Sequence, residues 1–231
     1  MPTPKPAPLV LLDVNETLLD LAGLDPLFGG AFGSAEWRAA WFQATLALAM
    51  KNTDEGQYQT FLLTGRQALA ALAQGRGREV PREFAEKLSA AIQTLPLHPD
   101  VPEGIRLLRE GGYRVGVLAN NPAAVVTAQL RHAGILNSLD AVLSADDARQ
   151  LKPGQRAYAY ALRETGAEAA ETWMVAAHVW DIRGAMAMGL RGAYLSRQSA
   201  WPQGEHPAPQ VSAATLPEAA QQVLHLAPVQ S

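Results

Sequence analysis

The sequence of 231 residues contains no cysteine, which excludes disulfide bonds, thiolate metal sites and a thiol nucleophile. It also lacks any block of like charge, and its net charge is only −3, so a nucleic acid is not expected as a partner. No segment approaches the ~20 apolar residues of a transmembrane helix, and the proline-rich residues 1–8 lack the apolar core of an export signal. We therefore expect a cytoplasmic protein that contacts no membrane.

Three common functional motifs are also missing. No glycine-rich phosphate loop follows the first predicted strand, and no Gly-x-Ser-x-Gly elbow occurs. The histidines at positions 98, 132, 206 and 225 are scattered, without the spacing of metal ligands. These absences argue against a nucleotide-binding loop, an ordinary serine hydrolase and a histidine metal site.

Short apolar runs alternate with helical patterns along much of the chain. We predict strands at 9–13, 113–120, 141–144, 173–178 and 192–195, and helices at 102–111, 122–133, 155–165 and 181–188. Alternation of this kind builds a parallel sheet with helices on both faces. Gly134, Gly166 and Gly189 follow three of these helices, as C-terminal caps should. The pattern predicts an α/β fold with a Rossmann-like parallel sheet.

Residues 21–95 break this alternation. Helical patterns at 35–52, 56–73 and 82–95 follow one another there without a strand between them. Because a crossover must return to the sheet, we predict that this insertion folds as a helical bundle over the strand ends. The expected organisation is a helical cap domain at 21–95 within a core domain formed by 1–20 and 96–231. One more helix is predicted in the tail, at 216–226.

Polar side chains follow the first four predicted strands, which are succeeded in turn by Asp13, Asn120, Lys152 and Asp181. The carboxyl ends of parallel strands share one edge of the sheet, where open α/β sheets bind ligands. Thr17, four residues after Asp13, can return its hydroxyl to the same turn. Taken alone, Asp13 could equally cap the next helix. The order of all four residues together favours a site.

This arrangement resembles the haloacid dehalogenase superfamily, and within it the L-2-haloacid dehalogenases, over nearly the whole chain. Phosphatases of the superfamily carry Asp-x-Asp in the first motif and an extra acid in the fourth, whereas this chain has Asn15 and a single Asp181. Two acids facing one lysine make a poor site for a divalent cation. The resemblance therefore implies the metal-free branch, which uses no cofactor and converts a small halogenated carboxylic acid, a short 2-haloacid, to its 2-hydroxyacid.

The resemblance also implies a role for each residue that follows a strand. Asp13 would attack the substrate carbon to form an aspartyl ester, and Asp181 would activate the water that hydrolyses the ester. Lys152 would lie between the two acids and keep Asp13 anionic. Thr17 would orient an oxygen of Asp13, and Asn120 would contact the halide or the substrate carboxylate.

Further matches concern the substrate pocket. Arg38, in the predicted helix at 35–52, resembles the arginine that receives the leaving halide, although most arginines simply lie on a solvated face. Phe61 and Trp180 resemble aromatic residues that line the pocket, and Tyr158 resembles a tyrosine that hydrogen-bonds near the lysine. Ordinary core packing explains Phe61 and Trp180 at least as well, and a lone tyrosine on a helix such as Tyr158 is more often a core residue.

The chain departs from the family at four positions. Ala119 stands where a serine or threonine binds the substrate carboxylate, Ala176 and His178 replace a serine and an asparagine, and Asn15 replaces a tyrosine in the pocket. Each lost hydrogen bond to an anionic substrate would weaken binding by about 1.5–3 kcal/mol. His178 could compensate by donating to a carboxylate or by positioning the water. It could also be a satisfied histidine at a strand end.

Two other functions stay open. The first is a Mg²⁺-dependent phosphatase with Asp13 as phosphoryl acceptor, against which Asn15 counts because the leaving alkoxide would lack its proton donor. The second is a degenerate member that binds a small anion or a partner protein, as the alanines at 119 and 176 suggest. The surviving charged residues argue against it, because charges drawn together without function are costly. The apolar face of residues 35–49 would permit a homodimer.

Overall fold

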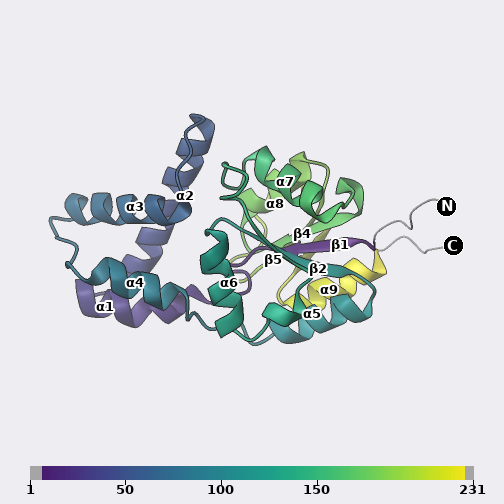
Figure 1. The fold of residues 1–231 in the computed structure, drawn as a ribbon, viewed down its shortest axis with the longest axis horizontal. Coiled ribbons are helices and arrows are strands. Elements are labelled where there is room, and N and C mark those ends of the chain that lie inside the picture. The colour runs from purple at the N-terminus through teal and green to yellow at the C-terminus, as the bar shows by residue number, and fades with distance from the viewer. Residues whose placement is uncertain (1–6, 227–231) are drawn as a thin grey trace.

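The computed structural model describes residues 7–226 and contains a six-stranded sheet in the order β3-β2-β1-β4-β5-β6 (Figure 1). All neighbouring strands in it are parallel. The strands are β1 (Leu9–Leu12), β2 (Arg114–Ala119), β3 (Ala141–Ser144), β4 (Thr172–Ala176), β5 (Arg191–Leu195) and β6 (Val211–Ala213). The predicted α/β fold with a parallel sheet is confirmed. Most of the proline-rich stretch at 1–8 lies outside the described residues.

β1 is the central strand, and its four side chains are fully buried because both faces of the sheet are covered. Val10 and Leu12 join the hydrophobic core of one face, and Leu9 and Leu11 join the core of the other. The Asp13 N–H still donates to the Val175 carbonyl at 2.9 Å. The chain therefore leaves the sheet directly after β1, between β2 and β4.

Helices cover both faces of the sheet. Residues of α5 (Val101–Glu110), α6 (Ala123–His132) and α9 (Leu216–His225) belong to one core, and residues of α7 (Gln155–Thr165) and α8 (Val179–Ala187) belong to the other. Figure 1 shows α5 and α9 below the sheet and α7 and α8 above it. Two short 3-10 helices, η2 (Leu136–Ser138) and η3 (Ala169–Glu171), lie in the connections. Each predicted core helix is present, within two residues at either end.

The insertion after β1 is helical, as predicted. It contains η1 (Leu21–Leu24), α1 (Asp25–Phe32), α2 (Glu36–Asp54), α3 (Phe61–Gly75) and α4 (Phe84–Ile92). Figure 1 shows α1–α4 grouped at one end of the molecule, beside the sheet. Aromatic rings fill the bundle: Phe32 stacks on Trp37 with 4.3 Å between ring centroids, and Phe28 meets Phe84 edge-on at 5.1 Å.

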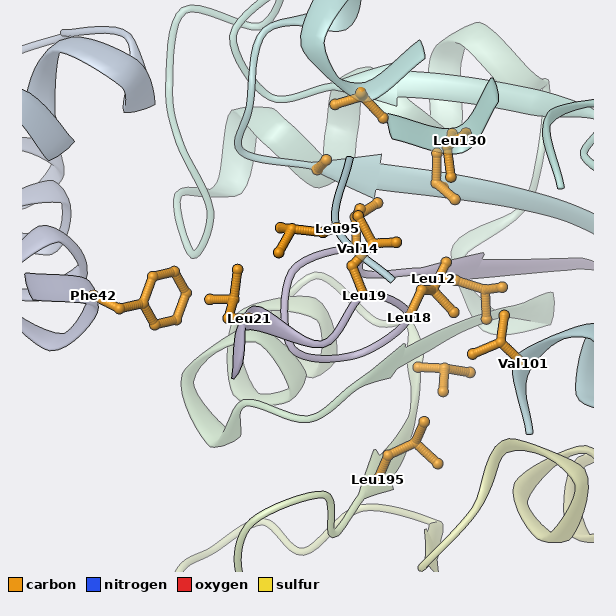
Figure 2. Close-up of a cluster of buried hydrophobic side chains, with 14 of the residues drawn as sticks. Leu12, Val14, Leu18, Leu19, Leu21, Phe42, Leu95, Val101, Leu130 and Leu195 are labelled. Atoms are coloured by element: carbon orange, nitrogen blue, oxygen red, sulfur yellow. The ribbon is translucent and has the colours of Figure 1, made fainter. Parts of the chain in front are cut away.

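The chain enters and leaves this bundle through two adjacent segments. Asp20 N–H donates to the Pro96 carbonyl at 2.9 Å, and His98 N–H donates to the Leu18 carbonyl at 2.9 Å. Leu18 and Leu95 lie in one cluster of apolar side chains near this junction, where Phe42 of α2 points toward it (Figure 2). The junction lies at the predicted limits of 21–95, and the division into two domains stays a prediction.

Besides the short 3-10 helices, one α-helix and one strand were not predicted. α1 contains Pro26, Gly29 and Gly30 within eight residues, a composition that disfavours a helix and that only the surrounding aromatic core overcomes. β6 has only three residues and is defined by its pairing with β5. In addition, α3 begins at Phe61 rather than at 56, where Thr60 caps it by accepting the Leu63 N–H. Among residues 7–226, no helix has the length and apolarity to cross a membrane.

The apolar face of α2 is already used within the chain. Trp37, Trp41, Phe42 and Leu46 are each at most 6% exposed, because they pack into the bundle and toward the core. This face therefore does not offer the dimer surface that the sequence suggested. The homodimer stays a prediction without that support.

We predict that Gly104→Ala lowers the free energy of unfolding by ~1–3 kcal/mol. A Cβ at Gly104 of α5 would lie only 2.8 Å from both Cβ and Cδ2 of Leu216 in α9. In the control, Gly30→Ala in α1, nothing lies within 4 Å of the new Cβ, so stability should stay equal or rise. Urea unfolding followed by circular dichroism checks both variants. Equal stability of the two variants would contradict the close α5–α9 packing.

Candidate active site

The buried ammonium of Lys152 lies between two carboxylates. Its Nζ is 2.9 Å from Asp13 Oδ1 and 2.6 Å from Asp181 Oδ2, and it also donates to the Leu118 carbonyl at 2.7 Å. Lys152 is 1% exposed and Asp181 is fully buried. The three N–H groups of the ammonium therefore each have an acceptor, which fixes its position and satisfies its charge.

The ends of the central strands bring these groups together. Asp13 follows β1, Leu118 and Asn120 lie at the end of β2, and Asp181 lies in the first turn of α8, which follows β4. Lys152 lies in the loop between β3 and α7. Asn120 holds this loop: its Oδ1 accepts the Lys152 N–H at 2.7 Å, and its Nδ2 donates to the Lys152 carbonyl at 3.3 Å. Parallel strand ends thus deliver the predicted residues to one place.

The electrostatics of the three charged groups favour an anionic Asp13. Burial by itself would raise the pKa of Asp13, but the Lys152 ammonium and His178 outweigh it and hold that pKa well below its usual value. Burial raises the pKa of Asp181; Lys152 opposes this effect and the Asp13 charge adds to it. Burial lowers the pKa of Lys152, but the two carboxylates outweigh it, so that pKa rises. Asp13 is therefore a stable carboxylate beside a stable ammonium.

Two hydroxyl groups orient the carboxylates. The Thr17 hydroxyl accepts the Ala177 N–H at 3.0 Å and donates to Asp13 Oδ2 at 2.7 Å. The buried Tyr158 hydroxyl donates to Asp181 Oδ1 at 2.7 Å. The Thr17 proton is therefore donated to Asp13. Both oxygens of Asp181 accept hydrogen bonds, one from Tyr158 and the other from Lys152.

His178 connects Asp13 to a residue that the sequence reasoning missed. Its Nδ1 is 3.5 Å from Asp13 Oδ2, and its Nε2 is 2.9 Å from Oε2 of Glu16. Burial lowers the pKa of His178, but the carboxylates of Asp13 and Glu16 outweigh it and raise the pKa to about 9. Glu16 is 6% exposed and has a left-handed backbone with φ of 62°. No sequence pattern signals this contact, which depends on that unusual backbone.

A small cavity opens beside Asp13. Five of the seven residues predicted to bind substrate line it, namely Asn15, Phe61, Asn120, His178 and Trp180. Ala119 also lines the cavity and offers only a methyl group. The fully buried Tyr158 lies instead behind Asp181. The cavity therefore presents one carboxylate, one imidazole and two amides within mostly apolar walls.

A larger apolar cavity shares Asn15, Phe42 and Phe61 with the small one. It extends between the inserted helices and the start of α6, where its walls include Leu69, Leu88, Ile92 and Val125. Apolar surroundings of this kind keep water away from a carboxylate and strengthen its charge interactions. The inserted helices thus form the far wall of the site.

Arg38 lies in a different place from the one expected. Its Nε donates to Asp25 Oδ1 at 2.8 Å, and its Nη1 is 3.5 Å from Glu16 Oε1. The guanidinium lines a separate polar cavity with Glu16 and His98, and it reaches Asp13 only through Glu16 and His178. Its contact with a leaving group therefore stays a prediction.

The donor set around Asp13 does not fit a divalent cation. The oxygens of Asp13 and Asp181 that face each other already accept hydrogen bonds from Lys152. Asn15 supplies an amide rather than a carboxylate, and its Oδ1 accepts a hydrogen bond from Gln129 Nε2 at 3.4 Å. Within residues 7–226, no group of three or more His, Asp or Glu side chains is arranged to hold a metal ion. A metal between the two acids would have to displace the ammonium.

Comparison with known proteins gives consistent matches. A family model described as haloacid dehalogenase-like hydrolase matches residues 7–189. The (S)-2-haloacid dehalogenase 4A of Burkholderia cepacia is 29% identical over 71% of each chain. A probable phosphatase, IndB of Dickeya dadantii, is 30% identical over 79% of this chain and 78% of its own. The crystal structure of a dehalogenase with an intermediate complex superposes with a TM-score of 0.82 at 27% identity, covering 90% of this chain and 93% of the other.

We predict that Lys152→Met lowers the free energy of unfolding by ~3–5 kcal/mol at neutral pH, because two buried carboxylates lose their cation. In this variant, the pKa values of the two carboxylates would be higher in the folded than in the unfolded protein. Carboxylates shifted in this direction destabilise the folded state as pH rises. The loss in free energy of unfolding should therefore be smaller at about pH 5 than at neutral pH.

The control is Lys87→Met, which removes an exposed lysine that pairs with Glu83 at 3.1 Å. It should change stability by no more than ~0.5 kcal/mol. Urea titrations of both variants across this pH range measure the effect. A Lys152→Met variant as stable as wild type at neutral pH would contradict a charge-paired Asp13.

Proposed function

The chain belongs to the haloacid dehalogenase-like hydrolase family, and on that premise we propose that it hydrolyses the carbon–halogen bond of short 2-haloacids, through an ester on Asp13, to give 2-hydroxyacids. One observation carries this proposal: a buried Asp13 carboxylate, 2.9 Å from the Lys152 ammonium, borders an apolar cavity. A carboxylate held anionic without a metal, with little water around it, suits attack on carbon. The 29% identity to an (S)-2-haloacid dehalogenase supports the same chemistry.

In the first step, an oxygen of Asp13 bonds to the carbon that carries the halogen, and the halide leaves with the bonding electrons. The Lys152 ammonium keeps Asp13 deprotonated, and the Thr17 hydroxyl fixes the rotation of its carboxylate. Because the nucleophile is already fixed, the reaction loses less entropy on reaching the transition state. Asn120 lines the cavity, and its amide has a second hydrogen with which to contact the halide.

In the second step, water attacks the Asp13 ester and releases the 2-hydroxyacid. The Lys152 ammonium stays beside the ester and can stabilise negative charge that develops on the carbonyl oxygen. The resemblance assigns the activation of this water to Asp181, and that role stays a prediction.

The substrate is an anion, and the cavity contains a cationic group for it. His178, with a pKa of about 9, carries a proton at neutral pH and borders the cavity. In the free protein its positive charge attracts an anionic substrate toward the cavity. Ala119 and Ala176 offer no hydroxyl to the substrate carboxylate, so we expect weaker binding of that carboxylate than two hydroxyls would give.

A second candidate, a phosphatase that uses Mg²⁺, is favoured by the 30% identity to the probable phosphatase of Dickeya dadantii. Two features oppose it: Lys152 occupies the space between the acids, and Asn15 cannot protonate a leaving alkoxide. The cytoplasmic location and the homodimer remain proposals that await a direct test.

We predict that the protein releases halide from 2-chloropropionate, and that chelation of divalent cations leaves this rate unchanged. Asp13→Asn should lose essentially all turnover, because an amide is too weak a nucleophile for the displacement. Ion-selective measurement of halide follows the reaction, and Asn137→Asp, outside the site, is the matched control. Chelator-sensitive turnover of a phosphate ester without halide release would establish the phosphatase instead.

A second test locates the ester. Under single-turnover conditions in ¹⁸O-water, label should enter the Asp13 carboxylate, because the attacking water bonds to its Cγ. Mass spectrometry of the peptide that contains Asp13 detects the label. Label found only in the 2-hydroxyacid product would mean that water attacks the substrate directly, and it would exclude the ester.

A further inference from the structure

Asp181 has no access to the water that must hydrolyse the ester. Its side chain is fully buried, Oδ2 is bonded to Lys152 and Oδ1 to Tyr158. It does not line the cavity beside Asp13, whereas His178 does. The Nδ1 of His178 is buried without a hydrogen-bond partner and lies 3.5 Å from Asp13 Oδ2. His178 is thus the titratable group nearest to an ester at Asp13 that also faces the cavity.

We propose that His178 is the catalytic base that takes a proton from the attacking water at Nδ1, and that Glu16 is the positioning residue that holds the imidazole for this task. This inference rests on the proposed ester at Asp13. It replaces Asp181 as the base and leaves it the role of fixing Lys152.

The surroundings of His178 hold the ring in one orientation. Nε2 is 2.9 Å from Glu16 Oε2, so the Nε2 proton stays between the two residues and Nδ1 is the nitrogen that exchanges a proton. The rings of Trp180 and Phe42 lie 5.2 and 6.0 Å away on the imidazole's sides. Glu16 is itself fixed by Gln198, whose Nε2 donates to Oε1 at 2.8 Å.

The backbone of Glu16 supports a functional reason for this contact. Its φ of 62° is a left-handed conformation that a residue with a Cβ adopts only at an energetic penalty. That conformation brings the carboxylate to His178 and, at 3.5 Å, to the guanidinium of Arg38. A buried carboxylate on a strained backbone persists because the surrounding contacts compensate it.

The charges around His178 make it a base only when the ester is present. The anions that face it are Asp13 and Glu16. Lys152 lies beyond Asp13, and Arg38 lies beyond Glu16. Asp181, in the helix that follows His178, is neutralised by Lys152. In the free protein the two anions keep His178 protonated. Ester formation removes the charge of Asp13, which lowers the pKa of His178 and releases the Nδ1 proton to solvent.

The proton then cycles without a further reactant. The water oxygen bonds to Cγ of the Asp13 ester while one water proton passes to Nδ1 of His178. The intermediate breaks its bond to the 2-hydroxyacid oxygen, which takes that proton back from Nδ1. The Asp13 acid left behind protonates His178, which restores the resting carboxylate and imidazolium. In total, a haloacid and water give a hydroxyacid, a halide ion and one proton.

Single-turnover kinetics of two variants test the assignment. In His178→Asn, halide release should stay within a few-fold of wild type, whereas ester hydrolysis should slow by ~10²-fold or more, so that the ester accumulates on Asp13. Asp181→Asn should instead slow halide release, because Lys152 loses a partner. Ester accumulation in Asp181→Asn with normal hydrolysis in His178→Asn would overturn the proposal. An absence of halide release and of ester in the wild-type protein would overturn the proposed function itself.

The role of Glu16 is tested by pH. The rate of ester hydrolysis should rise with pH as His178 loses its proton. Removing the Glu16 charge lowers the pKa of His178, so in Glu16→Gln this rise should occur at lower pH. The control Glu86→Gln, at an exposed position of α4, should leave the profile in place. An unmoved profile in Glu16→Gln would show that Glu16 is only structural.

One measurement needs no turnover. Asp13→Asn removes the same charge that the ester removes, so NMR titration should give His178 a pKa at least about one unit lower than in wild type. The His178 signal is assigned by its loss in His178→Asn. An unchanged pKa would overturn the ester-dependent base.

Discussion

The contact between the Lys152 ammonium and two buried carboxylates is the constraint on which the site depends. A charge removed from water needs a partner and a complete set of hydrogen bonds, and here the strand ends provide both. β1 delivers Asp13, the end of β2 delivers the Leu118 carbonyl, and α8 delivers Asp181. Because the three acceptors come from different elements, the geometry of the ammonium depends on the whole sheet being in register.

Much of this arrangement follows from the sequence, because it depends on topology. Asp13, Lys152 and Asp181 each follow a strand of one parallel sheet, so their meeting could be predicted without coordinates. The functions assigned to side chains at a distance from the strand ends were harder to predict. Asn120 lies at the expected edge, yet its amide is largely used to hold the Lys152 loop, and Arg38 is engaged by Asp25 and Glu16.

Glu16 shows why the remainder could not be predicted. A glutamate three residues after the nucleophile looks like a solvated turn residue, and only its left-handed backbone turns it inward to His178. The departures at Ala176 and His178 likewise read as losses when each is taken alone. In the structure, His178 and Glu16 form one unit, so the histidine that reads as a loss in the sequence has a buried carboxylate as its partner. Similarly, α1 forms because aromatic packing overrides a poor helical composition.

The junction at Asp20 and Pro96 has a consequence for how such a protein can diversify. Its two segments are joined by backbone hydrogen bonds, so the insertion is attached at a single narrow base. The inserted helices contribute Phe42 and Phe61 to the cavity walls, whereas the sheet contributes the charged groups. An exchange of the insertion for one of another shape would therefore change which molecules reach Asp13, while the chemistry that makes Asp13 reactive would be inherited intact.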